Sequence, residues 1–142
     1  MYLLDTGVIS ELRKPRPHGG VLAWLHSTAD ADLHVSAVTI GEIQAGIELP
    51  REQDAAKAVE IEAWLELVAQ AYSVMPMDGA TFRAWARLMH RRSDTLVEDA
   101  MIAVTATVRP ELEIPINLHA PFLAPQALGN KGQHQRIQRD AF

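Results

Sequence analysis

The opening residues MYLLDTGVIS (residues 1–10) hold the pattern on which the fold depends: an apolar stretch, the carboxylate of Asp5, then Thr-Gly and a second apolar stretch. Residues 2–4 are typical of a short buried strand, and residues 8–12 of the first turns of a helix. Burying a carboxylate at this junction is costly unless a partner compensates. The sequence therefore predicts either a turn or cap role for Asp5, or a partner that uses its charge.

The rest of the sequence continues this alternation of short strands and helices. Further strands are predicted at residues 33–36 and 72–77, and a last one at residues 111–116, which Pro115 would restrict to a sheet edge. Helices are predicted over residues 21–29, 37–49, 52–71, 80–92 and 96–108. This alternation predicts an α/β fold with a mostly parallel sheet that is covered by helices on both faces.

The composition is that of one acidic domain without cysteine. The 142 residues carry a formal net charge of −5, and 48% of them are hydrophobic. The charge argues against electrostatic coating of nucleic acid, but not against nucleic acid as a substrate. No apolar run approaches the roughly 20 residues of a membrane span, and no signal-type segment is present, so we expect a cytoplasmic protein without membrane association. Residues 126–142 are polar and glutamine-rich, which predicts a loose tail after a domain at residues 1–125.

Three acids from distant segments are expected at one edge of the sheet. Asp5 follows the first strand, Glu42 lies early in the helix after the second strand, and Asp99 lies near the start of the helix at residues 96–108. Ligands of such sheets bind outside the carboxyl ends of the strands. Clustered carboxylates cannot all stay ionised without a cation, and carboxylates with water select Mg²⁺, or alternatively Mn²⁺. We therefore predict that Asp5, Glu42 and Asp99 bind a divalent metal and catalyse phosphodiester hydrolysis.

Helix capping is the structural alternative for part of this set. Thr39-x-x-Glu42 matches the capping-box pattern, in which the fourth residue bonds to the helix N-terminus. Thr95-x-x-Glu98 is a second such box. It predicts a capping role for Glu98, whereas its neighbour Asp99 remains the candidate metal ligand.

Other residues carry weaker signals. The helix at residues 80–92 has Asp78 as its predicted N-cap and contains four arginines. These arginines are expected to form a solvent-exposed face, or alternatively to contact RNA phosphates. The tryptophans are expected in the core or in a dimer contact, and the histidines lack metal-ligand spacing. The motif MPMDGAT (residues 75–81) suggests a phosphatase of the haloacid dehalogenase type, but Pro76 occupies the position of its nucleophile.

Three segments together resemble the PIN-domain ribonucleases, specifically the VapC/FitB-like toxins of bacterial type II toxin–antitoxin systems. They are MYLLDTGVISELRK, VSAVTIGEIQAGIE and DTLVEDAMIAVTATV, and the resemblance is strongest over residues 1–108. It implies a three-layer α/β/α domain, Mg²⁺-dependent cleavage of RNA, a homodimer, and inhibition by a cognate antitoxin. The family's metal-binding acids fall on Asp5, Glu42 and Asp99.

Two departures from the family pattern affect the expected activity. The opening motif of the family has Asn or Ser at the position of Gly7, where a side chain helps to orient the first acid. Later, the family has Thr-x-Asn-x-x-Asp-Phe, whereas this chain has IPINLHAPF (residues 114–122), in which Asn117 stands in register and the fourth acid is missing. The resemblance therefore predicts an endoribonuclease with reduced activity or, alternatively, a catalytically degenerate PIN domain that binds an antitoxin or other subunits.

Overall fold

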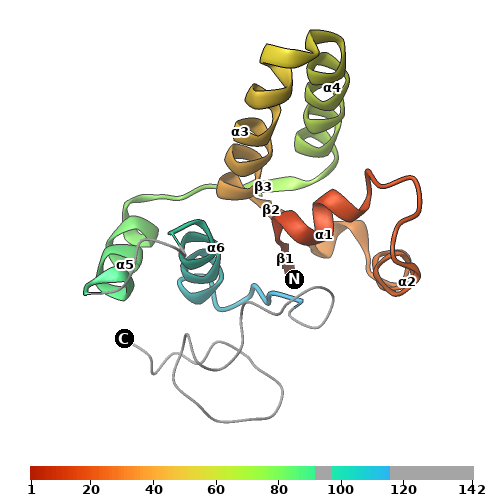
Figure 1. The fold of residues 1–142 in the computed structure, drawn as a ribbon. Coiled ribbons are helices and arrows are strands. Elements are labelled where there is room, and N and C mark those ends of the chain that lie inside the picture. Colours follow the sequence, from red (N-terminus) through yellow and green to blue (C-terminus); the bar gives the residue numbers. More distant parts are fainter. Residues whose placement is uncertain (92–96, 116–142) are drawn as a thin grey trace.

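The structure is a computed structural model that describes residues 1–91 and 97–115. Its elements alternate between short strands and helices (Figure 1). In chain order they are β1 (Tyr2–Leu4), α1 (Thr6–Glu11), α2 (Gly19–Ser27), the 3₁₀ helix η1 (Asp30–Asp32), β2 (Leu33–Ser36), α3 (Ala37–Gln53), α4 (Ala55–Ala71), β3 (Ser73–Met75), α5 (Gly79–Met89) and α6 (Val97–Thr107).

The three strands form one parallel sheet in the order β1-β2-β3. Leu3 pairs with His34, and Val35 pairs with Val74. Parallel neighbours need long crossovers, and helices supply them here, which confirms the predicted α/β class. The predicted strand at residues 33–36 is confirmed residue for residue, and that at 72–77 is shorter than predicted.

The predicted last strand forms only one isolated parallel bridge, between Tyr2 and Glu113, within the described residues. The Leu3 N–H donates to the Glu113 carbonyl at 2.8 Å, and the Glu113 N–H donates to the Met1 carbonyl at 2.9 Å. The contact lies on the free edge of β1, which agrees with the edge position that Pro115 requires.

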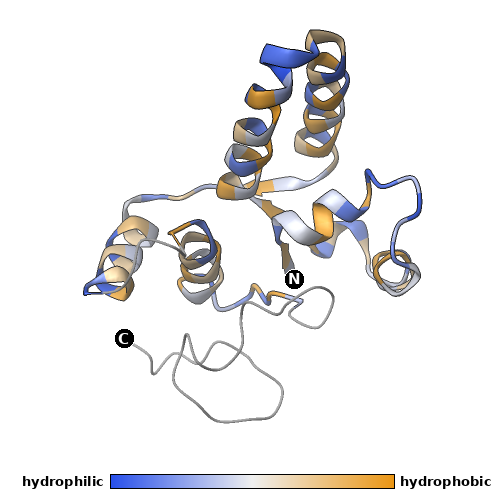
Figure 2. Cartoon of the chain, in the orientation of Figure 1, coloured by the Kyte–Doolittle hydropathy of each residue, from blue (hydrophilic) through white to orange (hydrophobic). Residues whose placement is uncertain are grey.

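Adjacent leucines of β1 divide the core into two layers. Leu4 is fully buried among α1, α2, α3 and α4, in a cluster that contains Val8, Ile43 and Leu65. Leu3 is fully buried in a second cluster with Ile102 and other residues of α6 and the segment after it. Successive strand residues point to opposite faces, so one dipeptide joins both helical layers to the sheet. Figure 2 shows the hydrophobic strand β1 between these helices.

Helices α3 and α4 form a hairpin that projects from the sheet (Figure 1). The first of these helices is longer than the range 37–49 that the sequence predicts, because α3 continues through Pro50 to Gln53. Pro50 removes a single N–H donor in the last turn, and its own carbonyl accepts from the Asp54 N–H at 2.7 Å. Asp54 is both the C-cap of α3 and the N-cap of α4, and it separates the two helices.

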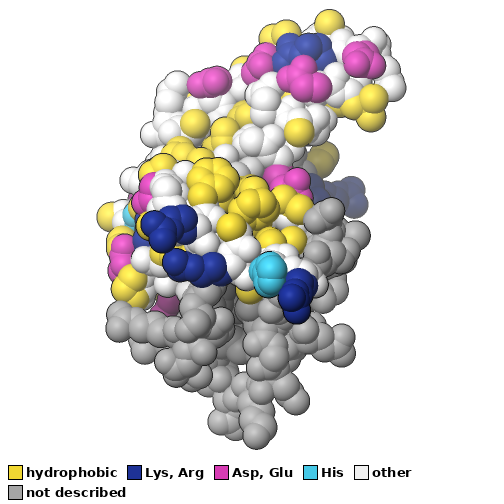
Figure 3. All heavy atoms as spheres, turned by 90° about the vertical axis from the view of Figure 1, so that its left-hand side faces the viewer, with side chains coloured by type: hydrophobic (Ala, Val, Ile, Leu, Met, Phe, Trp, Pro, Cys, Tyr) yellow, Lys and Arg dark blue, Asp and Glu magenta, His cyan; other side chains and the backbone are white. Residues whose placement is uncertain are grey.

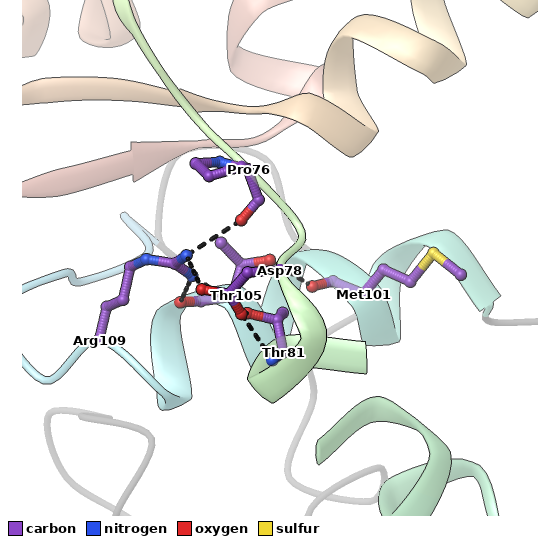
Figure 4. Close-up of polar contacts among 6 residues, drawn as sticks. All are labelled: Pro76, Asp78, Thr81, Met101, Thr105 and Arg109. Atoms are coloured by element: carbon purple, nitrogen blue, oxygen red, sulfur yellow. Dashed lines mark hydrogen bonds and ion pairs between the residues drawn. The ribbon is translucent and has the colours of Figure 1, made fainter. Parts of the chain in front are cut away.

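A polar network joins α5 to the end of α6 (Figure 4). Asp78 is the N-cap of α5, as predicted, and its Oδ1 accepts from the Thr81 N–H at 2.9 Å. Arg109 donates to Asp78 Oδ2 and to the Pro76 carbonyl, both at 3.0 Å. The bonds from Thr81 lower the pKa of Asp78, and the Arg109 charge lowers it further. These contacts align the N-terminus of α5 with the C-terminus of α6.

Several predictions lie wholly or partly outside the described residues. These include the domain boundary after residue 125, the tail at 126–142, the capping role of Thr95 and most of the segment 114–122. Across residues 1–91 and 97–115, no helix combines the length and the apolar character needed to cross a membrane.

Candidate functional site

Asp5 lies directly after β1 and is the N-cap of α1. Its Oδ1 accepts a hydrogen bond from the Val8 N–H at 2.8 Å. The capping alternative is therefore confirmed for one of its two carboxylate oxygens. This bond fixes the orientation of the side chain at the carboxyl end of the strand, and Oδ2 is the oxygen that a further partner would use.

Glu42 lies in α3 and is half-buried against α1. Its Oε2 accepts a hydrogen bond from the hydroxyl of Thr6, the residue after Asp5. Burial raises the pKa of Glu42, the bond from Thr6 lowers it, and the charges of Asp99, Glu98 and Asp5 raise it, with a net upward shift. The carboxylate is therefore held in place but poorly neutralised.

The predicted capping box at Glu42 is wrong. The N-cap of α3 is Ser36, whose Oγ accepts from the Val38 N–H at 3.1 Å. Thr39 is buried inside the helix, and its hydroxyl has no hydrogen-bond partner in the described part of the chain. Glu42 therefore lies too far along α3 to bond to the helix N-terminus, and it bonds to α1 instead.

Asp99 lies in the first turn of α6, which packs on the Leu3 face of the sheet and also contacts the start of α3, where Val38 packs against the same cluster. Its side chain is exposed, yet partial desolvation raises its pKa, and the charges of Asp5 and Glu98 raise it further. Asp5 therefore interacts electrostatically with both Glu42 and Asp99. The three acids are therefore near enough for their charges to influence one another's pKa.

The chemistry of this donor set fits a hard divalent cation, because mutually repelling carboxylate oxygens are what such an ion neutralises. The side chains are not gathered into a coordination shell: among the described residues, no group of three or more acidic or histidine side chains is close enough to hold a metal ion. The three acids are therefore electrostatically coupled without direct convergence.

The structure adds two residues that sequence reasoning did not assign to the site. Thr6 donates to Glu42, and Glu98 raises the pKa of both Glu42 and Asp99. In the sequence, each of these residues is the immediate neighbour of a predicted metal ligand, because Thr6 follows Asp5 and Glu98 precedes Asp99. Gly7, the first departure from the family pattern, lies in α1 and is exposed.

A groove of about 410 Å³ lies beside Glu42, between α1, α3 and α4. One side carries Arg13 and Lys14, which are paired with Glu60 and Glu11. The other walls are mainly apolar. The lining residues are Thr6, Ser10, Arg13, Lys14, Pro15, Glu42, Ile43, Gly46, Ile47, Ile61 and Trp64.

The family model of the PIN domain matches residues 2–110. This chain therefore belongs to the PIN-domain family, and its parallel sheet between two helical layers is the α/β/α arrangement expected from the sequence.

Its relatives include toxins and ribonucleases. Toxin FitB of Neisseria gonorrhoeae is 47% identical over 49 residues, which cover 34% of this chain and 35% of FitB. Ribonuclease VapC14 of Mycobacterium tuberculosis is 35% identical over 65 residues, which cover 46% of this chain and 63% of VapC14. The matches thus span less than two thirds of either relative.

The fold is also similar to a solved structure. The crystal structure of FitAcB from Neisseria gonorrhoeae has a TM-score of 0.66 and 30% sequence identity, and the match covers 80% of this chain and 85% of that chain.

Proposed function

We propose that this chain is a Mg²⁺-dependent endoribonuclease, the toxin of a type II toxin–antitoxin system, with Mn²⁺ as an alternative metal. The observation that carries the proposal is the match to the PIN domain over residues 2–110, with Asp5 directly after β1, Glu42 in α3 and Asp99 in the first turn of α6. The names of its relatives, a toxin and a ribonuclease, support the same activity.

Each residue has a defined task in this proposal. Asp5, Glu42 and Asp99 would hold the cation through carboxylate oxygens. The Val8 N–H fixes Asp5 Oδ1, and the Thr6 hydroxyl fixes Glu42 Oε2, so each acid retains an oxygen for the metal. When bound, a divalent ion lowers the pKa of a coordinated water and neutralises charge that develops on the phosphoryl oxygens.

The first prediction concerns RNA cleavage and its metal dependence. The purified chain should cleave a mixed pool of single-stranded RNA only when Mg²⁺ or Mn²⁺ is present. Asp5→Asn, Glu42→Gln and Asp99→Asn should each lower the rate by at least about tenfold, because each removes a ligand charge. Glu48→Gln is the matched control, since Glu48 lies on the same helix and is exposed. Cleavage that persists in EDTA, or that all variants retain, would contradict the assignment.

A degenerate PIN domain is the second candidate, and two observations favour it. The described acids do not form a metal-sized group, and Gly7 supplies no side chain to orient Asp5. In that case the chain would bind partners without turnover. A titration of Mg²⁺ with and without RNA separates the candidates, because a degenerate site shows no cleavage at any metal concentration.

The expected partners are a cognate antitoxin and a second copy of the chain. The groove beside Glu42 supports a peptide partner, because its walls are largely apolar. A peptide in this groove would lie against a proposed metal ligand and would thereby inhibit the site. Size-exclusion chromatography with light scattering tests the homodimer. A monomer at all accessible concentrations would contradict that part of the proposal.

A further inference from the structure

A second pocket, of about 650 Å³, lies between α5 and the end of α6. Arg83 and Arg87 line it, and its floor consists of small and apolar residues such as Ala84 and Val108. Figure 3 faces the α5 side of the molecule and shows Lys and Arg side chains beside a group of hydrophobic ones. The pocket is separate from the groove beside Glu42, with which it shares no lining residue.

The two arginines have no acidic partner within the described residues, and they are the ones that line this pocket. Within the described residues, Arg13, Arg51 and Arg109 each form an ion pair with a carboxylate. No carboxylate lies within ion-pair distance of Arg83 or Arg87 in the same part of the chain. Asp78, the acid at the N-terminus of α5, is already bonded to Arg109 and Thr81. Both guanidinium groups are therefore available to an external anion.

Their spacing suits a chain of anions better than one small anion. Arg83 and Arg87 lie four residues apart on one face of α5, a rise of about 6 Å along the helix. Guanidinium groups bind phosphate oxygens through two parallel hydrogen bonds, so each arginine can hold a separate phosphate. A net charge of −5 opposes RNA binding overall, and local unpaired cations are the means to overcome that repulsion.

The position of the pocket relates it to the proposed active site. Asp99 lies in the first turn of α6 and Thr107, which lines the pocket, in the last. The two are separated by about 12 Å along the helix axis. We propose that Arg83 and Arg87 form a phosphate-binding subsite that holds the RNA strand a few nucleotides from the bond to be cleaved. This inference rests on the proposed ribonuclease function and assigns a place to its substrate.

The second prediction is that Arg83→Gln/Arg87→Gln weakens RNA binding by about tenfold. The probe is a fluorescein-labelled single-stranded RNA of twelve nucleotides, measured by fluorescence polarisation in EDTA over a series of salt concentrations. The plot of log affinity against log salt should become shallower by about 1.4, since each single-strand contact contributes about 0.7. Arg16→Gln is the control, because Arg16 is exposed and also has no ion-pair partner among the described residues. It should change neither quantity.

Cleavage kinetics provide a second readout that a purely structural role would not change. In Mg²⁺, the double variant should raise KM for the twelve-nucleotide RNA with kcat preserved, because uniform substrate binding is lost. On a trinucleotide, which is too short to reach the pocket, the variant and the unsubstituted chain should match. Circular dichroism checks that α5 remains folded in both variants.

Three outcomes would overturn the subsite. If the unsubstituted chain cleaves RNA and the double variant behaves like Arg16→Gln, the inference fails and the ribonuclease proposal stands. If the double variant changes the oligomeric state and leaves the salt slope intact, this face binds a second copy, for which the exposed Phe82 provides apolar area. If the unsubstituted chain neither binds nor cleaves RNA, the proposed function fails together with the subsite.

Discussion

The hydrogen bond from Thr6 to Glu42 is the contact that defines the candidate site at the residue scale. It joins residues 36 positions apart and connects the residue after Asp5 to helix α3. The bond stabilises the ionised form of Glu42, but burial and three neighbouring acids act in the opposite direction and raise its pKa overall. The site is therefore held in an arrangement that is electrostatically unfavourable without a cation.

The third prediction is that Glu42→Gln stabilises the metal-free protein at neutral pH. A carboxyl whose pKa is raised on folding favours the folded state at pH below its unfolded pKa, and this contribution is lost as pH rises through the folded pKa. At pH 7 the ionised Glu42 is thus destabilising, whereas glutamine is neutral and can still accept from Thr6. Thermal unfolding in EDTA should give a higher Tm for Glu42→Gln at pH 7 and converge with the unsubstituted chain near pH 4.

Glu48→Gln provides a comparison with the opposite sign. Hydrogen bonds from Arg51 and Gln44 lower the pKa of Glu48, so its ionised form favours the folded state at neutral pH. Removing that charge should leave Tm unchanged or slightly lower, because the pair is exposed and screened. A Tm increase of equal size in both variants would show that the effect comes from the lower net negative charge of the protein and not from the surroundings of Glu42.

At the scale of elements, one residue separates the two helices of the projecting hairpin. Asp54 ends α3, and its Oδ1 accepts from the Lys57 N–H at 3.0 Å at the start of α4. The fourth prediction is that Asp54→Ala lowers stability by about 1 kcal/mol, as expected for loss of an N-cap. Asp54→Asn is the matched control, because asparagine caps about as well. Denaturant unfolding measures both, and equal losses in the two variants would contradict the capping role.

The α5–α6 pair depends on a different element-scale contact. The Arg109 side chain is only 16% exposed, and it bonds to Pro76, Asp78 and Thr81. This network fixes the two helices that form the arginine-lined pocket. Arg109 therefore supports the proposed RNA subsite by positioning these helices, without contacting the RNA.

At the scale of the whole molecule, the proposed metal ligands come from both helical layers. Asp5 and Glu42 belong to the layer of α1 and α3, and Asp99 to α6, which packs on the Leu3 face of the sheet and contacts the start of α3. An ion bound by all three would therefore connect the two layers, and its binding energy would add to global stability.

The fifth prediction is that Mg²⁺ raises Tm and that Asp99→Asn reduces this rise. At a hundred times Kd the gain in stability should be about 2.7 kcal/mol for the unsubstituted chain. Asp32→Asn is the control, because Asp32 is exposed in η1 and is not among the acids coupled to the site. An equal Mg²⁺ effect in both variants would indicate general ion screening.

Local patterns in the sequence were sufficient for much of the fold. The strands at residues 2–4 and 33–36 and the N-cap at Asp78 follow from side chains within a few positions, and the structure confirms them. The predicted end of α3 at residue 49 was wrong, because a proline in a last turn, here Pro50, costs a single hydrogen bond that neighbouring contacts can offset. Capping at Glu42 was wrong because Ser36, three residues before Thr39, already caps the helix.

The sequence by itself therefore determined the α/β class and pointed to three candidate acids, since strand and helix periodicity are local features, and the resemblance of three segments to a known family implied the PIN fold. Only the tertiary structure decided the partners: Thr6 for Glu42, Arg109 for Asp78, and the electrostatic coupling of Asp5 to acids of α3 and α6. The physical reason is that these contacts join segments distant in sequence. Their distances depend on how helices pack on the sheet, and no short-range pattern specifies that packing.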